Sequence, residues 1–254
     1  MENNIDPDFQ AIINKLSKAR QDNSPVLQPK VLIIDAMNTF LRSFAIINHI
    51  NPKGNHIGGL TGFLKSVGYA IKHTNPTRVI IAFEGEGSTL NKKNLYPDYK
   101  GTRKLKRITN FDGFSSQEDE SESIENQLLR LVEYLQCLPL DMCAVDRAEA
   151  DDTMAYLATK FAPTHDVVIM SSDQDFLQLV SPKITVYSPT KKKFYDPNKI
   201  KEEYGVPPQN YLQVKILLGD SSDNVPGVPK LGPKKLIKNF PELQESTVVS
   251  LKDI

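Results

Sequence analysis

The sequence predicts an α/β fold in which a mostly parallel sheet is flanked by helices and followed by a smaller helical subdomain. Three short, continuous apolar runs rich in β-branched residues are typical of parallel strands that are covered on both faces. They occupy residues 31–34, 79–83 and 167–170. Stretches with helical periodicity alternate with these runs, which is the pattern of a parallel βαβ sheet.

The elements follow in order along the chain. Residues 1–29 are polar, contain Pro25 and Pro29, and are expected to form an extension outside the core. The α/β domain is expected at 30–197, with helices over 60–73, 124–136, 150–161 and 175–180. Residues 198–254 have proline breaks and no further strong strand pattern, so they are predicted to form the helical subdomain.

One segment inside the domain has a different composition. Residues 109–123 are rich in Ser, Asp, Glu and Gly and poor in apolar side chains. Such a composition cannot bury enough apolar surface to offset the entropy of ordering. We therefore predict a mobile excursion there.

Length and composition are compatible with a soluble globular enzyme. The chain has 254 residues, 39% of them hydrophobic, which is enough for one large core. No apolar run approaches the roughly 20 residues that span a bilayer, and the acidic start is unlike a signal peptide. Cys137 and Cys143 are too few for a disulfide framework and are expected to be core thiols. These features predict a cytoplasmic monomer with no membrane partner.

The charge is balanced overall but arranged in blocks. The chain has 31 basic and 31 acidic residues, and a zero net charge is unusual for a nucleic-acid binder. Nine of the acids, however, fall in the short motifs described below, and if bound metal ions neutralise them, the remaining surface is basic. Residues 92–107 are rich in Lys and Arg, whereas residues 112–125 are almost purely acidic.

Each of the three apolar runs ends in carboxylates. Asp35 follows the first run, Glu84 the second, and Asp173 and Asp175 the third. The carboxyl ends of parallel strands lie at one edge of the sheet, where ligand sites of open α/β folds form. We therefore expect these four acids to converge.

Further acids join them at a helix start and in a later loop. They are Glu149, Asp151 and Asp152, then Asp220 and Asp223. So many carboxylates repel one another unless cations lie between them, and hard oxygen ligands suit Mg²⁺ or Mn²⁺. Two such ions, roughly 3.5–4 Å apart, can catalyse phosphodiester hydrolysis. A single acid is more simply a helix-start or turn residue, but turns would use Gly, Asn and Ser as well.

Five motifs occur in a fixed order along the chain. They are Ile34-Asp35-Ala36-Met37-Asn38 with Arg42, Leu95-Tyr96-Pro97-Asp98-Tyr99-Lys100-Gly101-Thr102-Arg103, Glu149-Ala150-Asp151-Asp152, Ser172-Asp173-Gln174-Asp175, and Leu218-Gly219-Asp220-Ser221-Ser222-Asp223-Asn224-Val225-Pro226-Gly227-Val228. Together they resemble the flap endonuclease and 5′–3′ exonuclease family, especially the phage ribonuclease H type and the 5′ nuclease domains of bacterial polymerases. The resemblance implies a PIN-like nuclease domain and a phage context, with the host cytoplasm as location.

The resemblance also implies two Mg²⁺ ions, for which Mn²⁺ can substitute. The ligands expected at or near the first ion are Asp35, Glu84, Glu149, Asp151 and Asp173. Those expected at the second ion are Asp175, Asp220 and Asp223, with Asp152 close by.

Three basic residues are implied to act on the substrate. Lys100 and Arg103 are expected to contact the scissile phosphate and stabilise its developing charge, and Arg42 to help hold the substrate. Residues 104–123 take the place of the helical arch through which a single 5′ strand passes. Without the motif, the simpler interpretation is that Lys100 and Arg103 belong to a solvated basic surface and that residues 104–123 form an ordinary loop.

The segment Gly227-Val228-Pro229-Lys230-Leu231-Gly232-Pro233-Lys234-Lys235 resembles a helix-hairpin-helix element, which grips duplex phosphates through backbone N–H groups at a helix N-terminus. The turn is set by Gly227 and Gly232, and Lys234, Lys235 and Lys238 add positive charge. The resemblance further implies a K⁺ ion at this hairpin.

Three features depart from the family pattern. Glu84 stands where the family has Asp, Lys230 stands where it has Gly, and the chain stops at Ile254 where relatives continue with more helices. The longer Glu84 side chain places its carboxylate about one methylene further out. Lys230 puts a side chain at a position where glycine would adapt freely.

The predicted function is structure-specific cleavage of DNA and RNA–DNA hybrids at 5′ ends or flaps, removing RNA primers or flaps during DNA replication. Assistance by a single-strand binding protein or a sliding clamp is left open. The alternative is a catalytically impaired DNA-junction binding protein. A phospho-aspartyl phosphatase is disfavoured, because it needs a second acid where Met37 stands.

Overall fold

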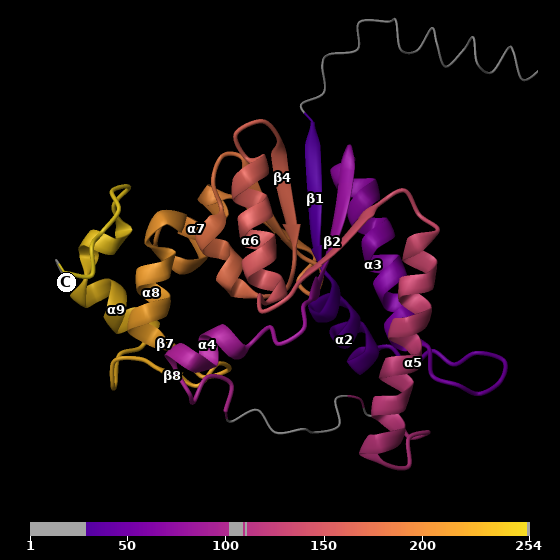
Figure 1. Cartoon of the computed structure of the whole chain (residues 1–254). Helices are drawn as coiled ribbons and strands as arrows, with labels where there is room; N and C mark the ends of the chain where they lie inside the picture. The colour runs from indigo at the N-terminus through magenta and orange to yellow at the C-terminus, as the bar shows by residue number, and fades with distance from the viewer. Residues whose placement is uncertain (1–28, 102–108, 110, 253–254) are drawn as a thin grey trace, which may run out of the picture.

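The computed structural model describes residues 29–101, 109 and 111–252 (Figure 1). Its centre is a six-stranded sheet in the order β3-β2-β1-β4-β5-β6. The strands are β1 (Lys30–Asp35), β2 (Arg78–Glu84), β3 (Asp141–Val145), β4 (Asp166–Met170), β5 (Ile184–Ser188) and β6 (Lys193–Tyr195). The first five are parallel and β6 is antiparallel to β5, so the predicted mostly parallel sheet is confirmed.

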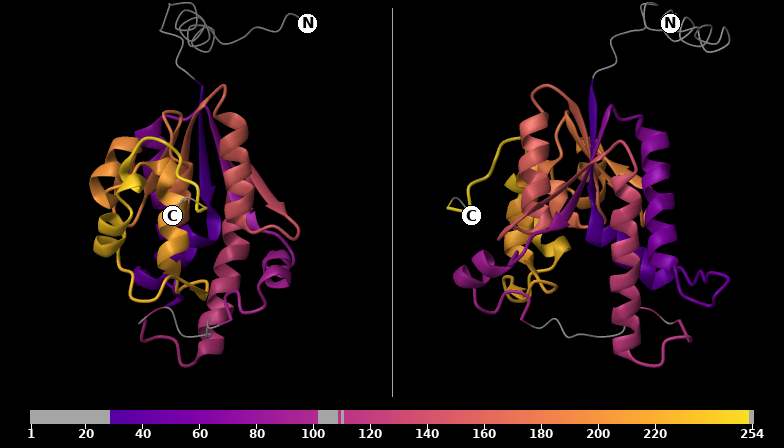
Figure 2. Two further views of the ribbon diagram at one scale, coloured as in Figure 1. Left: turned by 90° about the vertical axis from the view of Figure 1, so that its left-hand side faces the viewer. Right: turned by 45° about the vertical axis from the view of Figure 1, so that its right-hand side comes forward.

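Helices cover both faces of the sheet (Figures 1 and 2). One face carries α2 (Ala36–Ile46), α3 (Gly58–Thr74) and α5 (Gln117–Gln136). The other carries α6 (Ala150–Phe161), α7 (Pro197–Tyr204), α8 (Tyr211–Leu218) and α9 (Pro233–Asn239). Beyond the carboxyl edge, α4 (Leu90–Leu95) lies beside the short ribbon of β7 (Gly219–Asp220) and β8 (Val225–Pro226). The 3-10 helices are η1 (Gln174–Leu179), η2 (Pro208–Asn210) and η3 (Pro241–Gln244).

Strand β1 is apolar throughout because it packs on two cores. Successive side chains of a strand point to opposite faces. Val31 and Ile33 pack with α6 on one side, whereas Leu32 and Ile34 pack with α2, α3 and α5 on the other. All four are fully buried. Side chains of α7, α8 and α9 belong to the same cluster as α6, so the C-terminal helices share the core of the sheet.

Two sequence expectations on this part of the chain are wrong. The mobile excursion predicted for residues 109–123 is helical from Gln117, where α5 begins seven residues before the expected start at 124. The Ser116 hydroxyl accepts a hydrogen bond from Asp119 N, and acidic residues in the first turn complement the helix dipole. Cys137 is exposed rather than a core thiol, and Cys143 is partly buried.

Several elements were absent from the sequence prediction. Among the helices and strands, they are α2, α4, β3, β5, β6, β7 and β8. Edge position explains β3, which is largely exposed and therefore lacks a continuous apolar run. Residues 1–28 of the extension expected at 1–29, and the arch residues 104–108 and 110, lie outside the described residues. Within the described ranges, none of the helices combines the length and the apolar composition of a transmembrane span.

Candidate metal centre at the carboxyl edge of the sheet

Asp35 lies at the end of β1, the strand at which the chain order of the sheet reverses between β2 and β4. Crevices at such switch points are where open α/β sheets bind ligands. Its Oδ1 accepts a hydrogen bond from Asn38 N (3.0 Å) at the start of α2, and its Oδ2 accepts one from Ser171 Oγ (2.9 Å). Burial, together with the charges of Asp151 and Asp173, raises the pKa of Asp35 to about 6. Asp35 is thus a crowded, buried acid that a cation would stabilise.

Glu149 immediately precedes α6 and is the most buried of the predicted acids, with 1% of its surface exposed. Lys100 Nζ lies 2.5 Å from its Oε1, Tyr99 OH donates to its Oε2 (2.8 Å), and Lys92 Nζ donates to the same Oε2. Burial alone would raise the pKa of Glu149, but the hydrogen bonds from Lys100, Lys92 and Tyr99 outweigh it and hold that pKa below its usual value. Glu149 is therefore an ionised acid inside a basic cage.

The first turn of α6 brings two more acids to the same edge. Burial raises the pKa of Asp151 to about 6, although the nearby Lys92 charge opposes this shift. Asp152 forms an ion pair with Lys92 (3.1 Å) and is half exposed. Glu84, at the end of β2, is exposed, and its Oε2 accepts a hydrogen bond from Ala150 N (3.2 Å) at the start of α6. The family-divergent Glu84 thus reaches the helix that carries the other acids.

The remaining acids come from η1 and β7. Asp173 is the N-cap of η1, where its Oδ1 accepts a hydrogen bond from Asp175 N (2.9 Å). Asp175 and Asp220 both pair with Lys215, whose Nζ lies 2.8 Å from Asp175 Oδ1 and 2.5 Å from Asp220 Oδ2. Asp223 follows Asp220 by three residues, and its backbone N donates to Asp220 Oδ1 (3.2 Å). Two segments far apart in sequence are therefore joined through one lysine.

A turn before the undescribed segment holds Lys100 at the acids. Lys100 has a φ of 55°, a left-handed conformation that non-glycine residues adopt rarely. Its backbone N donates to Asp223 O (3.0 Å), and Tyr96 OH donates to Asn224 O (3.0 Å). Arg42 is exposed on α2, and Arg103 lies outside the described residues. Of the three predicted cations, the structure therefore shows Lys100 in contact with the acids.

Position 230, in the hairpin between α8 and α9, has a backbone conformation that favours glycine. Lys230 has a φ of 63°, in the left-handed region that glycine enters without strain. Gly227 packs against Leu218, and a Cβ there would lie 2.1 Å from Leu218 O, so this position requires glycine. Gly232 is the N-cap of α9, and Lys234, Lys235 and Lys238 are exposed on that helix.

Side-chain cations, rather than a ready-made cluster of ligands, neutralise many of these acids. Among the described residues, no group of three or more His, Cys, Asp or Glu side chains is arranged to hold a metal ion. Sequence reasoning missed Lys92, Tyr99 and Lys215 as partners of the acids. Lys92 and Tyr99 lie in segments that it had singled out, but Lys215 lies in an ordinary helical stretch that carries no such signal.

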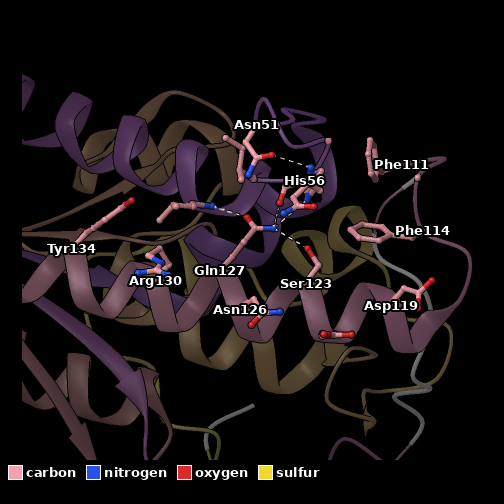
Figure 3. Close-up of a pocket in the computed structure, with 16 residues that line it drawn as sticks. Asn51, His56, Phe111, Phe114, Asp119, Ser123, Asn126, Gln127, Arg130 and Tyr134 are labelled. Carbon is pink, nitrogen blue, oxygen red and sulfur yellow. Dashed lines mark hydrogen bonds between the residues drawn. The ribbon is translucent and has the colours of Figure 1, made fainter.

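A groove of about 790 Å³ lies away from these acids, between the α2–α3 loop and α5 (Figure 3). Gln127 Nε2 donates to His56 O (3.0 Å) and Ser123 Oγ (3.1 Å), and its Oε1 accepts from Leu60 N (3.1 Å). The His56 ring lies 5.0 Å from the Phe111 ring. None of the predicted site residues lines this groove. The Gln127 hydrogen bonds connect α5 to the α2–α3 loop and to the start of α3.

The sheet order identifies an open α/β domain. Its acids lie at the switch point, at the carboxyl edge of the sheet, where such domains bind ligands. The chain belongs to the 5′-3′ exonuclease family, because the model of the "5'-3' exonuclease, N-terminal resolvase-like domain" matches residues 30–205. The resemblance predicted from the five motifs is thereby confirmed.

Relatives include a 5'-3' exonuclease of Bacillus subtilis, which is 31% identical over 83% of this chain and 70% of its own length. The DNA polymerase I of Bacillus caldotenax is 29% identical over 90% of this chain, and the chain spans about 25% of that relative.

The solved structures that match share the fold. A bacteriophage T5 D15 flap endonuclease in a complex with DNA and metal ions matches with a TM-score of 0.68 at 21% identity, covering 85% of this chain and 76% of that one. The agreement supports the α/β architecture through most of the chain.

Proposed function

We propose that this protein is a divalent-metal-dependent nuclease that hydrolyses phosphodiester bonds of DNA and RNA–DNA hybrids at 5′ ends or flaps. The observation that carries the proposal is the convergence of acids at one edge of the sheet, where they lie at the ends of β1 and β2, in the segment after β4 and at the start of α6, together with Lys100. Family membership and the T5 complex with DNA and metal ions support it. Removal of RNA primers or flaps during replication is the proposed task.

The residue types fit divalent ions. Carboxylate oxygens are the ligands that Mg²⁺ and Mn²⁺ prefer, and the buried Asp35 and Asp151 are acids whose charge a cation would compensate. The proposed holders of a first ion are Asp35, Glu84, Glu149, Asp151 and Asp173, and those of a second are Asp175, Asp220 and Asp223, with Asp152 nearby. When bound, such ions activate water and stabilise the leaving oxygen.

The chain's own cations act on the phosphate. Lys100 is held at the acidic edge by its backbone bond to Asp223, so its ammonium is pre-positioned for an anionic substrate. Arg103 and Arg42 are proposed to add positive charge to the same substrate. Glu149 keeps the ammonium groups of Lys92 and Lys100 close together before the substrate arrives.

The C-terminal hairpin is proposed to grip the duplex beside the cut site. Lys234, Lys235 and Lys238 are exposed on α9, where they can meet phosphates without reading bases. Lys230 already adopts the left-handed backbone that the turn requires, so the departure from glycine leaves the hairpin intact. We also propose that this hairpin binds a K⁺ ion.

Product mapping on labelled DNA tests the function. We expect wild-type protein with Mg²⁺ or Mn²⁺ to cut a 5′-flap duplex and an RNA-primed duplex, and chelation to stop cleavage. Asp173→Ala should lose cleavage but keep most of its binding to the branched DNA, whereas Asp166→Ala, at the opposite edge of the sheet, should cut normally. Parallel reactions with a single-strand binding protein or a sliding clamp show whether either assists. Cleavage by Asp173→Ala at the wild-type rate refutes the proposed site, and binding without any cleavage by the wild type favours a junction-binding protein.

A further inference from the structure

A lysine lies between two of the acids proposed for the second ion. Lys215 belongs to α8, Asp175 to η1, and Asp220 to β7. The Lys215 ammonium is 2.8 Å from Asp175 Oδ1 and 2.5 Å from Asp220 Oδ2. One side chain therefore bridges carboxylates from two separate elements.

Lys215 contacts carboxylate oxygens that accept few or no other hydrogen bonds. Asp175 Oδ1 is buried and makes no hydrogen bond in the described part of the chain, so the nearby ammonium is its electrostatic compensation. At Asp220, the oxygen Oδ1 already accepts from Ser222 N (2.8 Å), Ser222 Oγ (2.6 Å) and Asp223 N (3.2 Å). The oxygen Oδ2 is the one that faces Lys215.

Asp35, at the first proposed position, is neutralised differently. Its oxygens accept from Asn38 N and Ser171 Oγ, which are neutral donors. A cation can therefore approach Asp35 without displacing an ammonium, although Glu149, proposed for the same ion, holds Lys92 and Lys100. At the Asp175–Asp220 pair a cation must displace Lys215.

We propose that Lys215 is a built-in counter-cation that holds the second metal position in the metal-free protein and is displaced when the second ion binds. The inference rests on the proposed function, because that function assigns Asp175 and Asp220 to the second ion. An ammonium and a dication compete for the same two oxygens, since like charges at contact distance repel. The second ion therefore binds only when the ammonium moves away.

Lys215 is able to move aside. Its side chain is 26% exposed, and a flexible four-carbon stem carries the charge. In the metal-free state the lysine also relieves the repulsion between two carboxylates held close together. Its removal should thus weaken the metal-free fold and strengthen the second metal site at the same time.

Calorimetric titration of the metal-free full chain with Mn²⁺ and with Mg²⁺ tests this pair of effects. We expect two binding events in the wild type, one for each proposed position. In Lys215→Gln and Lys215→Met the event at the Asp175–Asp220 position should tighten on the order of tenfold, as expected when a competing unit charge is removed at this distance. Lys215→Arg should keep the wild-type separation of the two events.

Thermal unfolding of the same proteins supplies a readout that does not depend on activity. Without metal, Lys215→Gln should melt several degrees below the wild type, and saturating Mg²⁺ should raise its melting temperature more than that of the wild type. Lys183→Gln is the control, because it removes a surface ion pair with Asp166 (2.9 Å) at the opposite edge of the sheet. It should change neither the two affinities nor the response to metal.

The outcomes distinguish the role of Lys215 from the proposed metal-dependent function. If the wild type binds two ions and Lys215→Gln binds the second with unchanged affinity, the counter-cation role is overturned and the proposed function stands. If the wild type binds no divalent ion, both the inference and the metal-dependent function are overturned. A tightened second event with a lowered metal-free melting temperature supports the role of Lys215.

Discussion

Replacing Asp35 by Asn should stabilise the metal-free protein while abolishing cleavage. Asp35 is 8% exposed and bears a charge that burial opposes, so the ionised form weakens the fold unless a cation is bound. Asn has nearly the same shape and can still accept the hydrogen bond from Asn38 N. Function and stability are thus expected to move in opposite directions at this residue.

The magnitude follows from the pKa of Asp35. Burial raises it from 3.8 to about 6, which corresponds to about 3 kcal/mol of lost stability at pH values well above 6. A carboxyl group with a raised pKa contributes stability below its unfolded pKa and loses it as pH rises through the folded pKa. The gain from Asp35→Asn should therefore be about 2–3 kcal/mol at pH 7.5, after some loss at the Ser171 contact, and roughly half of that at pH 5.

Urea unfolding in the presence of a chelator at both pH values measures this gain. Asp141→Asn is the control, because Asp141 is half exposed in a surface ion pair with Arg78, and its replacement should change stability by less than about 0.5 kcal/mol. Added Mg²⁺ should stabilise the wild type more than the Asp35→Asn variant. A variant that is less stable than the wild type at pH 7.5, or whose gain does not shrink at pH 5, would refute the reasoning.

Three further predictions concern cleavage, binding and metal choice. Lys100→Ala should lower the single-turnover cleavage rate on the order of a hundredfold and the affinity for DNA much less. Equal losses of rate and affinity would mean that Lys100 binds the substrate and the transition state equally. Lys234→Ala combined with Lys235→Ala should weaken duplex binding for all sequences and flatten its salt dependence, and an unchanged salt slope would remove the hairpin from the interface. Because Glu84 is longer than Asp and reaches Ala150 N, the wild type should prefer Mn²⁺ over Mg²⁺ and Glu84→Asp should reduce that preference. Metal titrations of cleavage check this, and Glu84→Ala with wild-type rate and metal dependence would contradict a ligand role.

The sequence by itself determined the parallel sheet and the edge at which the acids meet. Val31 to Ile34 are apolar at every position because β1 is covered on both faces, and Asp35 ends the run because the strand ends there. The same logic placed Glu84 at the end of β2 and Asp173 in the segment that follows β4. A local pattern was sufficient in these cases, because burial on both faces leaves a continuous apolar run.

Only the tertiary structure decided which cation meets which acid. Lys92 and Glu149 are 57 residues apart, and Lys215 meets Asp175 across a chain separation that no periodicity records. Edge strand β3 and the early start of α5 also escaped the pattern, since exposed strands and acidic helix turns lack apolar periodicity. An ion pair between distant segments forms only where packing brings a long, flexible side chain close to its partner. Because the core fixes the positions of the helices, a local sequence pattern does not predict these pairs.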